Sequence, residues 1–196
     1  MFDDILSIVL RAAYWVLVPA ALLRFYMQAI RLSLRNSVGQ FICAVTDFIV
    51  KPTRRVVPGA GGYDWASLIA ALVFELVHAL LFDLLSLRLV IFSSGAAVVL
   101  WLAGGVFGLL GAALTVALWT LVAYAVLSWI RADSAIGDVL GALVNPWLRP
   151  IRRRMPMVGG FDLSPLVLMV FLNILLVVLP RVQGSVMMTL SGVLRI

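Results

Sequence analysis

Cysteine and histidine are almost absent from this sequence, which has one of each, Cys43 and His78. A lone cysteine cannot close an intramolecular disulfide, so cysteine usage carries no information on the redox compartment. A metal site needs more ligands than His78 and the nearby Glu75 supply, and Cys43 has no partner for one. No Ser-His-Asp order, catalytic carboxylate pair or phosphate-binding glycine loop is visible either. We therefore expect no catalytic residues, no metal and no cofactor.

Charge is also scarce in this chain. Charged residues make up 12% of the 196 residues and hydrophobic residues 64%, and the mean hydropathy is +1.14. This composition is far more apolar than that of a soluble domain and indicates an integral membrane protein. The net charge of +6 therefore needs a membrane interpretation before a nucleic-acid one, because Lys and Arg beside spans set topology and contact anionic lipid. Asp3 and Asp4 stand where a secretory signal has basic residues, so we expect no cleaved signal.

A basic stretch rich in proline and glycine occurs twice. Residues 145–165 read NPWLRPIRRRMPMVGGFDLSP, and a shift of 98 positions aligns them without a gap with residues 47–67, DFIVKPTRRVVPGAGGYDWAS. The matches lie in prolines, arginines, glycines and aspartates, which coincide by chance less easily than leucines do. We therefore predict an internal duplication, with residues 1–98 and 99–196 as the two repeats. The aligned pairs are Pro52 with Pro150, Arg54 with Arg152, Arg55 with Arg153, Pro58 with Pro156, Gly61 with Gly159, Gly62 with Gly160 and Asp64 with Asp162.

Four apolar stretches are long enough to cross a membrane, which takes roughly 20 residues. The predicted spans are about residues 5–30, 65–85, 104–130 and 163–180. Residues 90–103 either extend the third span or dip into the membrane. Arg24 lies close enough to the end of the first span to snorkel to the surface. The tail after Pro180 is predicted as an interfacial segment.

Each repeat also contains a short amphipathic helix after its first span. Asn36 can act as N-cap in the first copy, and Asp133 or Ser134 can do so in the second. Apolar side chains then recur at helical spacing in both copies. The stripe of the first copy is Val38, Phe41, Ile42, Val45 and Ile49, and that of the second is Ile136, Val139, Leu140 and Leu143. Such a helix either lies in the interface plane or packs on the bundle, and both interpretations stay open.

An elbow that returns the chain to the bilayer follows each amphipathic helix. We define the first elbow as residues 51–64 and the second as residues 149–162. Pro156 of the second elbow, which aligns with Pro58 of the first, ends a helix. The glycine pair of each elbow permits backbone angles that other residues resist. Asn145, which precedes a proline, predicts the start of a short separate turn of helix. Asp64 and Asp162 are each placed to cap the next span and to favour its positive N-terminal end.

Basic residues concentrate within each repeat. Five of the 15 Lys and Arg residues lie between the first and second spans and five between the third and fourth, whereas the connection between the repeats holds only Arg88. The positive-inside rule then places both elbows in the cytoplasm and both termini outside. The fold prediction is an all-α membrane protein with four transmembrane helices, built as two parallel helical-hairpin repeats. Each repeat has a short amphipathic interfacial helix and a basic Pro/Gly elbow, and a pseudo-two-fold axis along the membrane normal relates the two.

The elbows carry the residues that we expect to bind a ligand. These are Lys51, Arg54, Arg55, Asp64, Arg149, Arg152, Arg153 and Asp162. One interpretation is anchoring, in which arginines hold head groups while Arg54 and Arg152 pair with the aspartate ten residues later. The other is that the two elbows form a joint cytoplasmic surface for anionic lipid or a protein partner. Arginine suits phosphate and carboxylate alike, so the sequence does not choose between these ligands.

Two features of the spans stay outside this scheme. Glu75 and His78 lie one turn apart in an apolar run, where an ionised group costs about 2.5–3.5 kcal/mol on insertion scales. They either form a proton relay or ion site, or satisfy each other by a hydrogen bond that faces the bundle. Gly104 and Gly108, continued by Gly111, Ala112 and Thr115, form a face of small residues on which a helix can pack, within the bundle or across a dimer.

The repeated motifs resemble the YggT family, also called YlmG, of small integral membrane proteins. Each copy has the pattern P-x-R-R followed by a proline, a glycine pair and an aspartate, and the second copy adds NPWLRPIRR and DLSP. The resemblance covers about residues 27–71 and 124–176. The first copy departs from the pattern where Asn36 and Asp47 lack a following proline and where Ala66-Ser67 replaces Ser-Pro.

The resemblance implies a role in tolerance of osmotic or extracytoplasmic stress, in cell division or nucleoid distribution, or in cytochrome assembly, and it implies no reaction or cofactor. We therefore expect a non-enzymatic scaffold or assembly factor of the bacterial cytoplasmic (inner) membrane. Its basic surface would bind anionic head groups, a membrane protein partner or a second copy, and no nucleic acid directly. The alternative is a small ion or solute channel or transporter, for which Glu75, His78 and Thr115 supply few polar groups. A lipid-handling enzyme is a third class, and no catalytic set supports it.

Overall fold

The computed structural model describes residues 2–85, 94–130, 134–154 and 162–194. Every regular element in these ranges is an α-helix. The helices are α1 (Phe2–Ala29), α2 (Ser37–Val56), α3 (Trp65–Leu85), α4 (Gly95–Ile130), α5 (Ala135–Arg152) and α6 (Ser164–Leu194). Within the described ranges four of them, α1, α3, α4 and α6, are long and apolar enough to cross a membrane. The predicted class, an all-helical protein with four spans, is therefore confirmed, and the chain is a multi-pass membrane protein.

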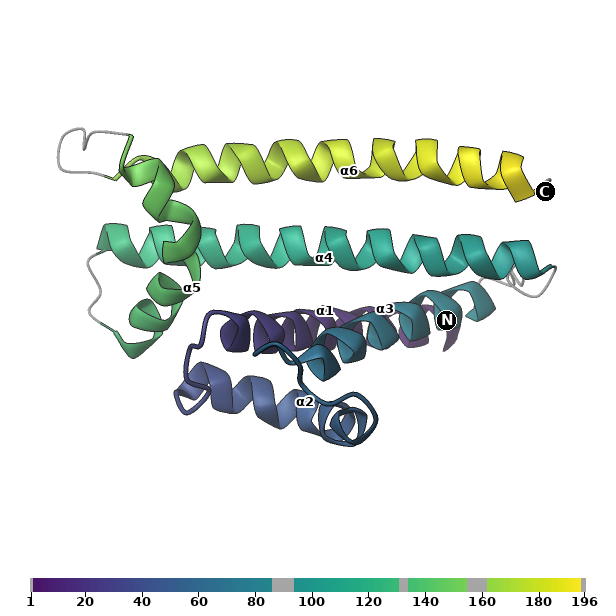
Figure 1. Cartoon of the computed structure of the whole chain (residues 1–196), viewed down its shortest axis with the longest axis horizontal. Coiled ribbons are helices and arrows are strands. Elements are labelled where there is room, and N and C mark those ends of the chain that lie inside the picture. Colours follow the sequence, from purple (N-terminus) through teal and green to yellow (C-terminus); the bar gives the residue numbers. More distant parts are fainter. Residues whose placement is uncertain (1, 86–93, 131–133, 155–161, 195–196) are drawn as a thin grey trace.

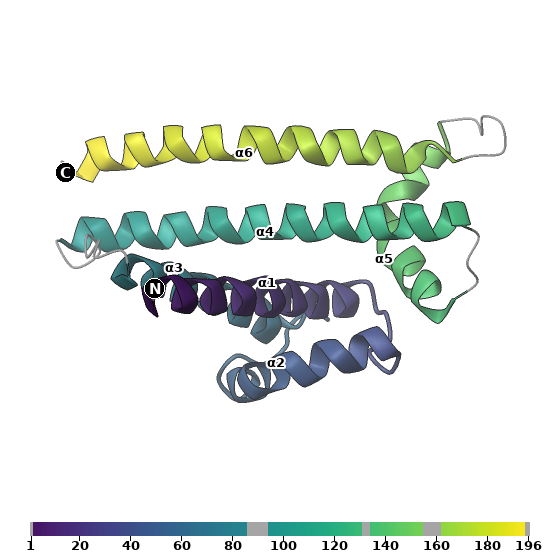
Figure 2. The ribbon, with the colours of Figure 1, turned by 180° about the vertical axis from the view of Figure 1, so that it is seen from behind.

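The four long helices lie side by side along one direction (Figure 1). α1 and α4 run toward the end of the bundle where α2 and α5 follow them, whereas α3 and α6 run away from it, and both termini lie at the opposite end (Figures 1 and 2). α2 runs back beside the bundle and packs on α1 and α3, while α5 crosses to α6 and packs on α4 and α6. Both amphipathic helices thus pack on the bundle. Their position at the membrane surface stays a prediction.

The bounds of α3 agree with the second predicted span, but two other spans are longer than predicted. α4 begins at Gly95, so residues 95–103 extend the third span and do not form a separate segment; residues 90–93 lie outside the described residues. α6 continues through Pro180 to Leu194, so the fourth span does not end at Pro180. A proline removes one backbone hydrogen bond, and a long apolar helix tolerates that loss.

The N-caps of the amphipathic helices follow the prediction. Asn36 Oδ1 accepts from the Gly39 N–H at 2.7 Å, and Ser134 Oγ accepts from the Gly137 N–H at 3.0 Å. Ser134 is therefore the second cap, and Asp133 lies outside the described residues. The predicted new helix start at Asn145 is wrong, because α5 continues through this position. Its apolar side chains on both sides, Val144 and Leu148, are fully buried and hold the helix together across the proline.

The small residues of α4 let its neighbours approach closely. A methyl group added at Gly105 would collide with Leu76 of α3, and one added at Gly108 would collide with the Glu75 carboxyl. Gly104 and Gly111 instead face α6, where an added Cβ would lie 4.0 Å from Met187 and 3.6 Å from Leu179. The small-residue face therefore serves packing within the bundle, as one of the two interpretations predicted.

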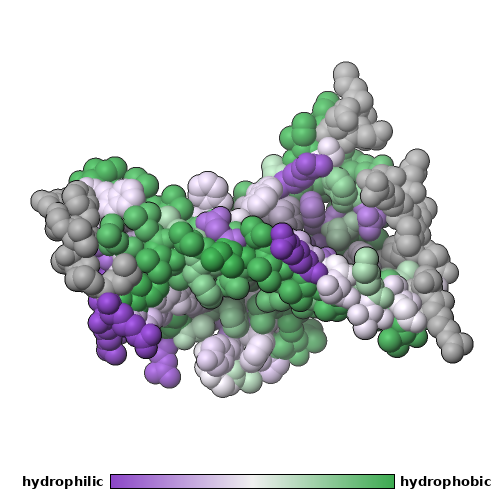
Figure 3. All heavy atoms as spheres, turned by 90° about the horizontal axis from the view of Figure 1, so that it is seen from above, coloured by the Kyte–Doolittle hydropathy of each residue, from purple (hydrophilic) through white to green (hydrophobic). Residues whose placement is uncertain are grey.

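The bundle exposes apolar side chains where a soluble protein would expose polar ones. Hydrophobic residues cover most of the face formed by α6 (Figure 3). The exposed large side chains of this helix include Val167, Val170, Phe171, Ile174 and Val177. An apolar surface of this extent needs an apolar environment, which for four long helices is the bilayer.

Candidate functional site: two elbows closed by arginine–aspartate pairs

The first elbow is held by a two-pronged ion pair. Arg54, in the last turn of α2, donates from Nη2 to Asp64 Oδ2 at 2.6 Å and from Nε to Asp64 Oδ1 at 3.1 Å. The Asp64 side chain is only 4% exposed, whereas that of Arg54 is 41% exposed. A bidentate pair fixes geometry as well as charge. It therefore ties the end of α2 to the start of α3.

Asp64 receives two further donors from the helices around it. The Ser67 hydroxyl donates to Oδ2 from within α3, and Gln28 Nε2 at the end of α1 donates at 2.9 Å. Burial by itself would raise the pKa of Asp64, but the Arg54, Ser67 and Gln28 hydrogen bonds together with the Arg54 charge hold it below its ordinary value. The carboxylate thus stays charged, and it joins three helices.

The glycine pair of the first elbow adopts the backbone that the sequence predicted. Gly61 and Gly62 have φ angles of 66° and 83°, in the left-handed region that favours glycine. The turn is closed by the Tyr63 N–H, which donates to the Ala60 carbonyl at 3.2 Å, and by the Trp65 indole, which donates to the same carbonyl at 3.1 Å. The corresponding pair at 159–160, with Pro156, lies outside the described residues.

The second elbow repeats the ion pair with different helpers. Arg152 Nε donates to Asp162 Oδ2 at 2.6 Å, Nη1 to Asn145 Oδ1 at 3.1 Å and Nη2 to the Tyr124 hydroxyl at 2.9 Å. Burial raises the pKa of Asp162, but hydrogen bonds from Ser164 and Arg152 and the Arg152 charge lower the pKa by a larger amount, so the net shift is downward. Arg152 therefore links α5 to the end of α4 and the start of α6.

The predicted cap at the start of the next span is present in the second copy. Asp162 Oδ1 accepts from the Ser164 backbone N–H at 2.9 Å, at the beginning of α6. The Asp64 carboxylate differs, because its partners among the described residues are the side chains of Gln28, Arg54 and Ser67 and include no backbone N–H. These side chains reach the carboxylate first, so Asp64 acts as a junction between helices.

The structure brings each predicted arginine to the aspartate ten residues later, but it keeps the two pairs apart. α2 and α5 contact each other through Ile42, Val139 and Leu143, near the beginning of α2 and the middle of α5. The end of α2, which carries Arg54, lies beyond α1 and α3 at one edge of the bundle, whereas the end of α5, which carries Arg152, lies beside the start of α6 at the other edge (Figures 1 and 2). One chain thus presents two basic elbows, each closed on its own repeat.

The remaining predicted cations stay at the surface. Lys51, whose side chain is 69% exposed, pairs with Asp47 at 2.7 Å one turn away. Arg55, Arg149 and Arg153 are exposed, as is the neighbouring Arg154. These side chains can reach an anionic ligand without breaking an elbow, which Arg54 and Arg152 cannot do.

Sequence reasoning missed a buried arginine in the first repeat. Arg24 is 3% exposed and donates from Nη1 to the Thr46 hydroxyl at 2.7 Å and to Asp47 Oδ1 at 2.8 Å. Hydrogen bonding by Lys51 lowers the pKa of Asp47, burial opposes this, and Arg24 lowers the pKa further. The prediction that Arg24 snorkels to the surface is wrong, because polar partners on α2 reach it. The available signal was Thr46 and Asp47, adjacent polar residues on a helix next to the α1 span.

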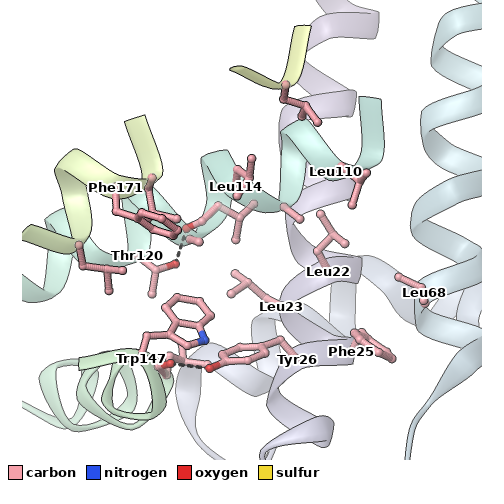
Figure 4. Close-up of a pocket in the computed structure, with 17 residues that line it drawn as sticks. Leu22, Leu23, Phe25, Tyr26, Leu68, Leu110, Leu114, Thr120, Trp147 and Phe171 are labelled. Carbon is pink, nitrogen blue, oxygen red and sulfur yellow. Dashed lines mark hydrogen bonds between the residues drawn. The ribbon is translucent and has the colours of Figure 1, made fainter. Parts of the chain in front are cut away.

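An apolar pocket of about 640 Å³ lies between the helices beside α5. Its walls come from α1, α3, α4, α5 and α6, and Figure 4 shows Leu22 and Leu23 of α1 facing Leu114 and Phe171 across it. Trp147 of α5 lies at one end, next to the Tyr26 hydroxyl, which donates to the Leu143 carbonyl at 2.8 Å. A pocket with so few polar groups cannot stabilise water, so it suits a hydrocarbon chain.

Glu75 and His78 both face neighbouring helices, but the predicted hydrogen bond between them is not found. Glu75 is 8% exposed, and its Oε2 is buried without a hydrogen-bond partner among the described residues. His78 Nε2 is likewise buried without one, and the imidazole stacks on Tyr14 of α1 with ring centroids 4.3 Å apart. The described residues contain no group of three or more His, Cys, Asp or Glu side chains arranged to hold a metal.

Comparison with known proteins agrees with the repeat and with its motifs. The sequence profile of the CCB3/YggT family matches residues 2–85 and 103–183, one segment in each predicted repeat. A protein of Escherichia coli (strain K12) named "Uncharacterized protein YggT" is 36% identical over 156 residues, which are 79% of this chain and 78% of that protein. A Vibrio alginolyticus protein, "Uncharacterized protein in proC 3'region", is 33% identical over 170 residues, 86% of this chain and 89% of its own length. A Pseudomonas aeruginosa protein is 31% identical over 147 residues, 74% of this chain and 73% of its own.

No solved structure matches the chain. The family match covers well over half of the sequence and includes both arginine–aspartate elbows, and it confirms the resemblance drawn from the motifs. The chain therefore belongs to the CCB3/YggT family.

Proposed function

We propose that this protein is a non-enzymatic membrane scaffold that binds anionic lipid on the cytoplasmic side of the bacterial inner membrane. Two parallel hairpin repeats would each present an amphipathic helix and a basic elbow to the head groups. The physiological setting would be the one that the resemblance to the YggT family implies, tolerance of osmotic or extracytoplasmic stress or a step of cell division.

The observation that carries this proposal is that some arginines of the elbows are ion-paired whereas others are exposed. Arg54 and Arg152 are occupied by Asp64 and Asp162, whereas Arg149 and Arg153 of the second repeat are exposed. The paired arginines hold each elbow in shape, and the exposed ones remain for phosphate. A basic residue near an anionic membrane surface contributes about 1 kcal/mol to binding.

The pocket supports a lipid over a protein as the ligand. Trp147, which lines the pocket, precedes the exposed Arg149 by two residues on α5. A lipid would place one acyl chain among the leucines of the pocket and its phosphate at the basic end of α5, where Arg149 and Arg153 are exposed. Tryptophan and tyrosine at the pocket end suit the head-group level of a bilayer.

The test is retention of lipid by the purified protein. The variant Arg149→Gln with Arg153→Gln should lose phosphatidylglycerol and cardiolipin roughly 30-fold relative to the unchanged chain in mixed micelles, because it removes two contributions of about 1 kcal/mol each. Arg181→Gln, which removes one positive charge on α6 away from the elbows, is the control, and each single variant, Arg149→Gln and Arg153→Gln, is compared with it. Lipid content is measured by mass spectrometry at low and at high salt.

A narrower pocket gives an independent variant. Ala117→Trp fills part of the cavity and should reduce lipid retention without changing any charge. Lipid content that is unchanged in both variants would overturn the lipid proposal, and a co-purifying protein lost on neutralising Arg149 and Arg153 would favour a protein partner. In a strain that lacks the protein, growth after osmotic upshift should be restored by the Arg181→Gln variant and not by the Arg149→Gln, Arg153→Gln variant.

The channel alternative is separated by transport measurements. The pocket beside α5 is apolar, and Glu75 is not among the residues that line it. A scaffold passes neither ions nor small solutes, so proteoliposomes should show the flux of protein-free vesicles. Flux that depends on Glu75 would support a channel or transporter instead.

A further inference from the structure

Of the four buried side-chain polar atoms that lack a partner among the described residues, one, Arg24 Nε, lies on α1 and three lie on α3 or α4. These three are Glu75 Oε2, His78 Nε2 and Trp101 Nε1. Buried polar atoms are nearly always paired, so each exception calls for an explanation such as a bound proton, ion or water. Such an explanation is needed most for Glu75, because its carboxyl is buried in the middle of a spanning helix.

The fold makes room for this carboxyl but supplies no counter-charge. Gly108 of α4 faces Glu75, and an added Cβ there would collide with Oε1, so the glycine leaves space for the acid. The ion pairs among the described residues all lie in the elbows or between α1 and α2, and none includes Glu75. An unpaired carboxylate in an apolar bundle is costly, whereas the protonated acid is neutral.

The titratable groups around Glu75 come from α1 and from its own helix. Tyr14 of α1 is the titratable group that adjoins the carboxyl, and its ring lies against His78 with centroids 4.3 Å apart. Arg11 lies over the Phe82 ring at 5.1 Å, one turn beyond His78, and its charge acts on the imidazole. The facing residues of α4, Gly105 and Gly108, bring no titratable group.

These groups lie on one side of Glu75 only. From Glu75 through Tyr14 and His78 to Arg11, they lead toward the end of the bundle that holds both chain termini. On the other side, toward the elbows, lies a buried apolar cluster that includes Val18, Ala21 and Ala71. The titratable groups around the carboxyl therefore all lie toward the end of the bundle that holds the termini.

We propose that Glu75 is a proton-binding site in the middle of the membrane that exchanges its proton with the side of the bilayer opposite the elbows, by way of Tyr14 and His78. On uptake, the Tyr14 hydroxyl donates its proton to the carboxylate and regains one that His78 has taken from the aqueous side, and release reverses these steps. The site is separate from the lipid-binding elbows and does not depend on them. One-sided access binds a proton without transporting it.

The first test is chemical. Dicyclohexylcarbodiimide reacts with protonated carboxyls in apolar surroundings, so in proteoliposomes at neutral pH it should modify Glu75, as located by mass spectrometry, and not the ion-paired Asp64 or Asp162. Modification should fall at least tenfold as the pH on the side of the termini is raised, and raising the pH on the elbow side should leave it unchanged. No modification at any pH, or an equal response to both sides, would overturn the proposal. Suppression by Na⁺ or K⁺ at constant pH would make the site a cation site instead.

The second test is spectroscopic and identifies the relay. The infrared band of a protonated carboxyl should be present in the unchanged protein and absent from Glu75→Gln. Its shift on transfer to D₂O should slow at least tenfold in Tyr14→Phe and in His78→Leu. Tyr26→Phe, a change at another α1 tyrosine that does not face Glu75, should leave the rate unchanged. If Glu75→Gln does not fold, the D₂O exchange rates of the other three variants still decide the proposal, and equal rates in all of them would refute the relay.

Discussion

Replacement of Arg54 by methionine tests whether the arginine–aspartate pair holds the elbow. Methionine keeps an unbranched, flexible side chain that reaches about as far as Nε of arginine, and it removes the charge and the donors. Asp64 would remain 4% exposed, with Ser67 and Gln28 as its donors and without its bidentate cation. The end of α2 would then lose its polar attachment to α3.

The size of the effect follows from burial on the two sides of the pair. Removing one partner of a fully buried ion pair costs about 3–5 kcal/mol, and a hydrogen bond to a charged group contributes about 1.5–3 kcal/mol. Arg54 is 41% exposed, so solvent screens part of the interaction, and two donors remain on Asp64. We therefore expect Arg54→Met to lower the free energy of unfolding by about 2 kcal/mol.

The measurement is unfolding by sodium dodecyl sulfate in mixed micelles, followed by circular dichroism. The reactivity of Cys43, the only thiol, reports on α2 separately. Arg55→Met, at the exposed neighbour, is the matched control and should change stability by less than about 0.5 kcal/mol. In a double-mutant cycle, Arg54→Met should cost less in an Asp64→Asn background. Equal stability of the Arg54 and Arg55 variants, or purely additive effects in the cycle, would refute the stabilising role of the Arg54–Asp64 pair.

Three further predictions concern pH, packing and capping. Asp64 and Asp162 have lowered pKa values in the folded protein, so the stability that they contribute is complete above the ordinary aspartate pKa of about 3.9 and is lost as the pH falls through the lowered values. The unfolding midpoint should therefore drop on acidification below about pH 4. An unfolding midpoint that does not change there would contradict the ion pairs. Gly105→Ala should destabilise the bundle by about 1–3 kcal/mol in the same unfolding assay, whereas Gly104→Ala, which meets its neighbour only at 4.0 Å, should be neutral or slightly stabilising. Asn36→Ala removes the cap of α2 and should cost about 1 kcal/mol with a loss of helical signal at the start of α2, which amide exchange detects; unchanged protection there would argue against the cap.

The sequence predicted those parts of the fold that depend on local patterns. Runs of apolar residues located the four spans, and capping side chains just ahead of the amphipathic stripes located the cap at Asn36 and narrowed the second cap to Asp133 or Ser134. The ten-residue spacing in the repeat predicted both arginine–aspartate pairs, because a helix end, a turn and a helix start bring those positions together.

Features set by neighbouring helices escaped prediction. Asn145 reads as a helix start on its own, yet burial of Val144 and Leu148 against α4 and α6 carries α5 through it. The sequence predicts that Arg24 snorkels to the surface, but in the structure Thr46 and Asp47 of α2 accept its hydrogen bonds. The pocket beside Trp147 also arises between helices from both repeats, so no single segment of sequence indicates it.

The length of α4 sets a condition on the membrane around it. Its 36 residues contain no charged side chain and extend about 54 Å, against a hydrocarbon thickness of about 30 Å. To place the whole helix within the hydrocarbon region, α4 would have to tilt by more than roughly 40° from the bilayer normal, which is the upper end of the range found for transmembrane helices. The lipids beside α4 should therefore stretch to reduce this hydrophobic mismatch, and the protein should partition into the thickest bilayers that the cell offers.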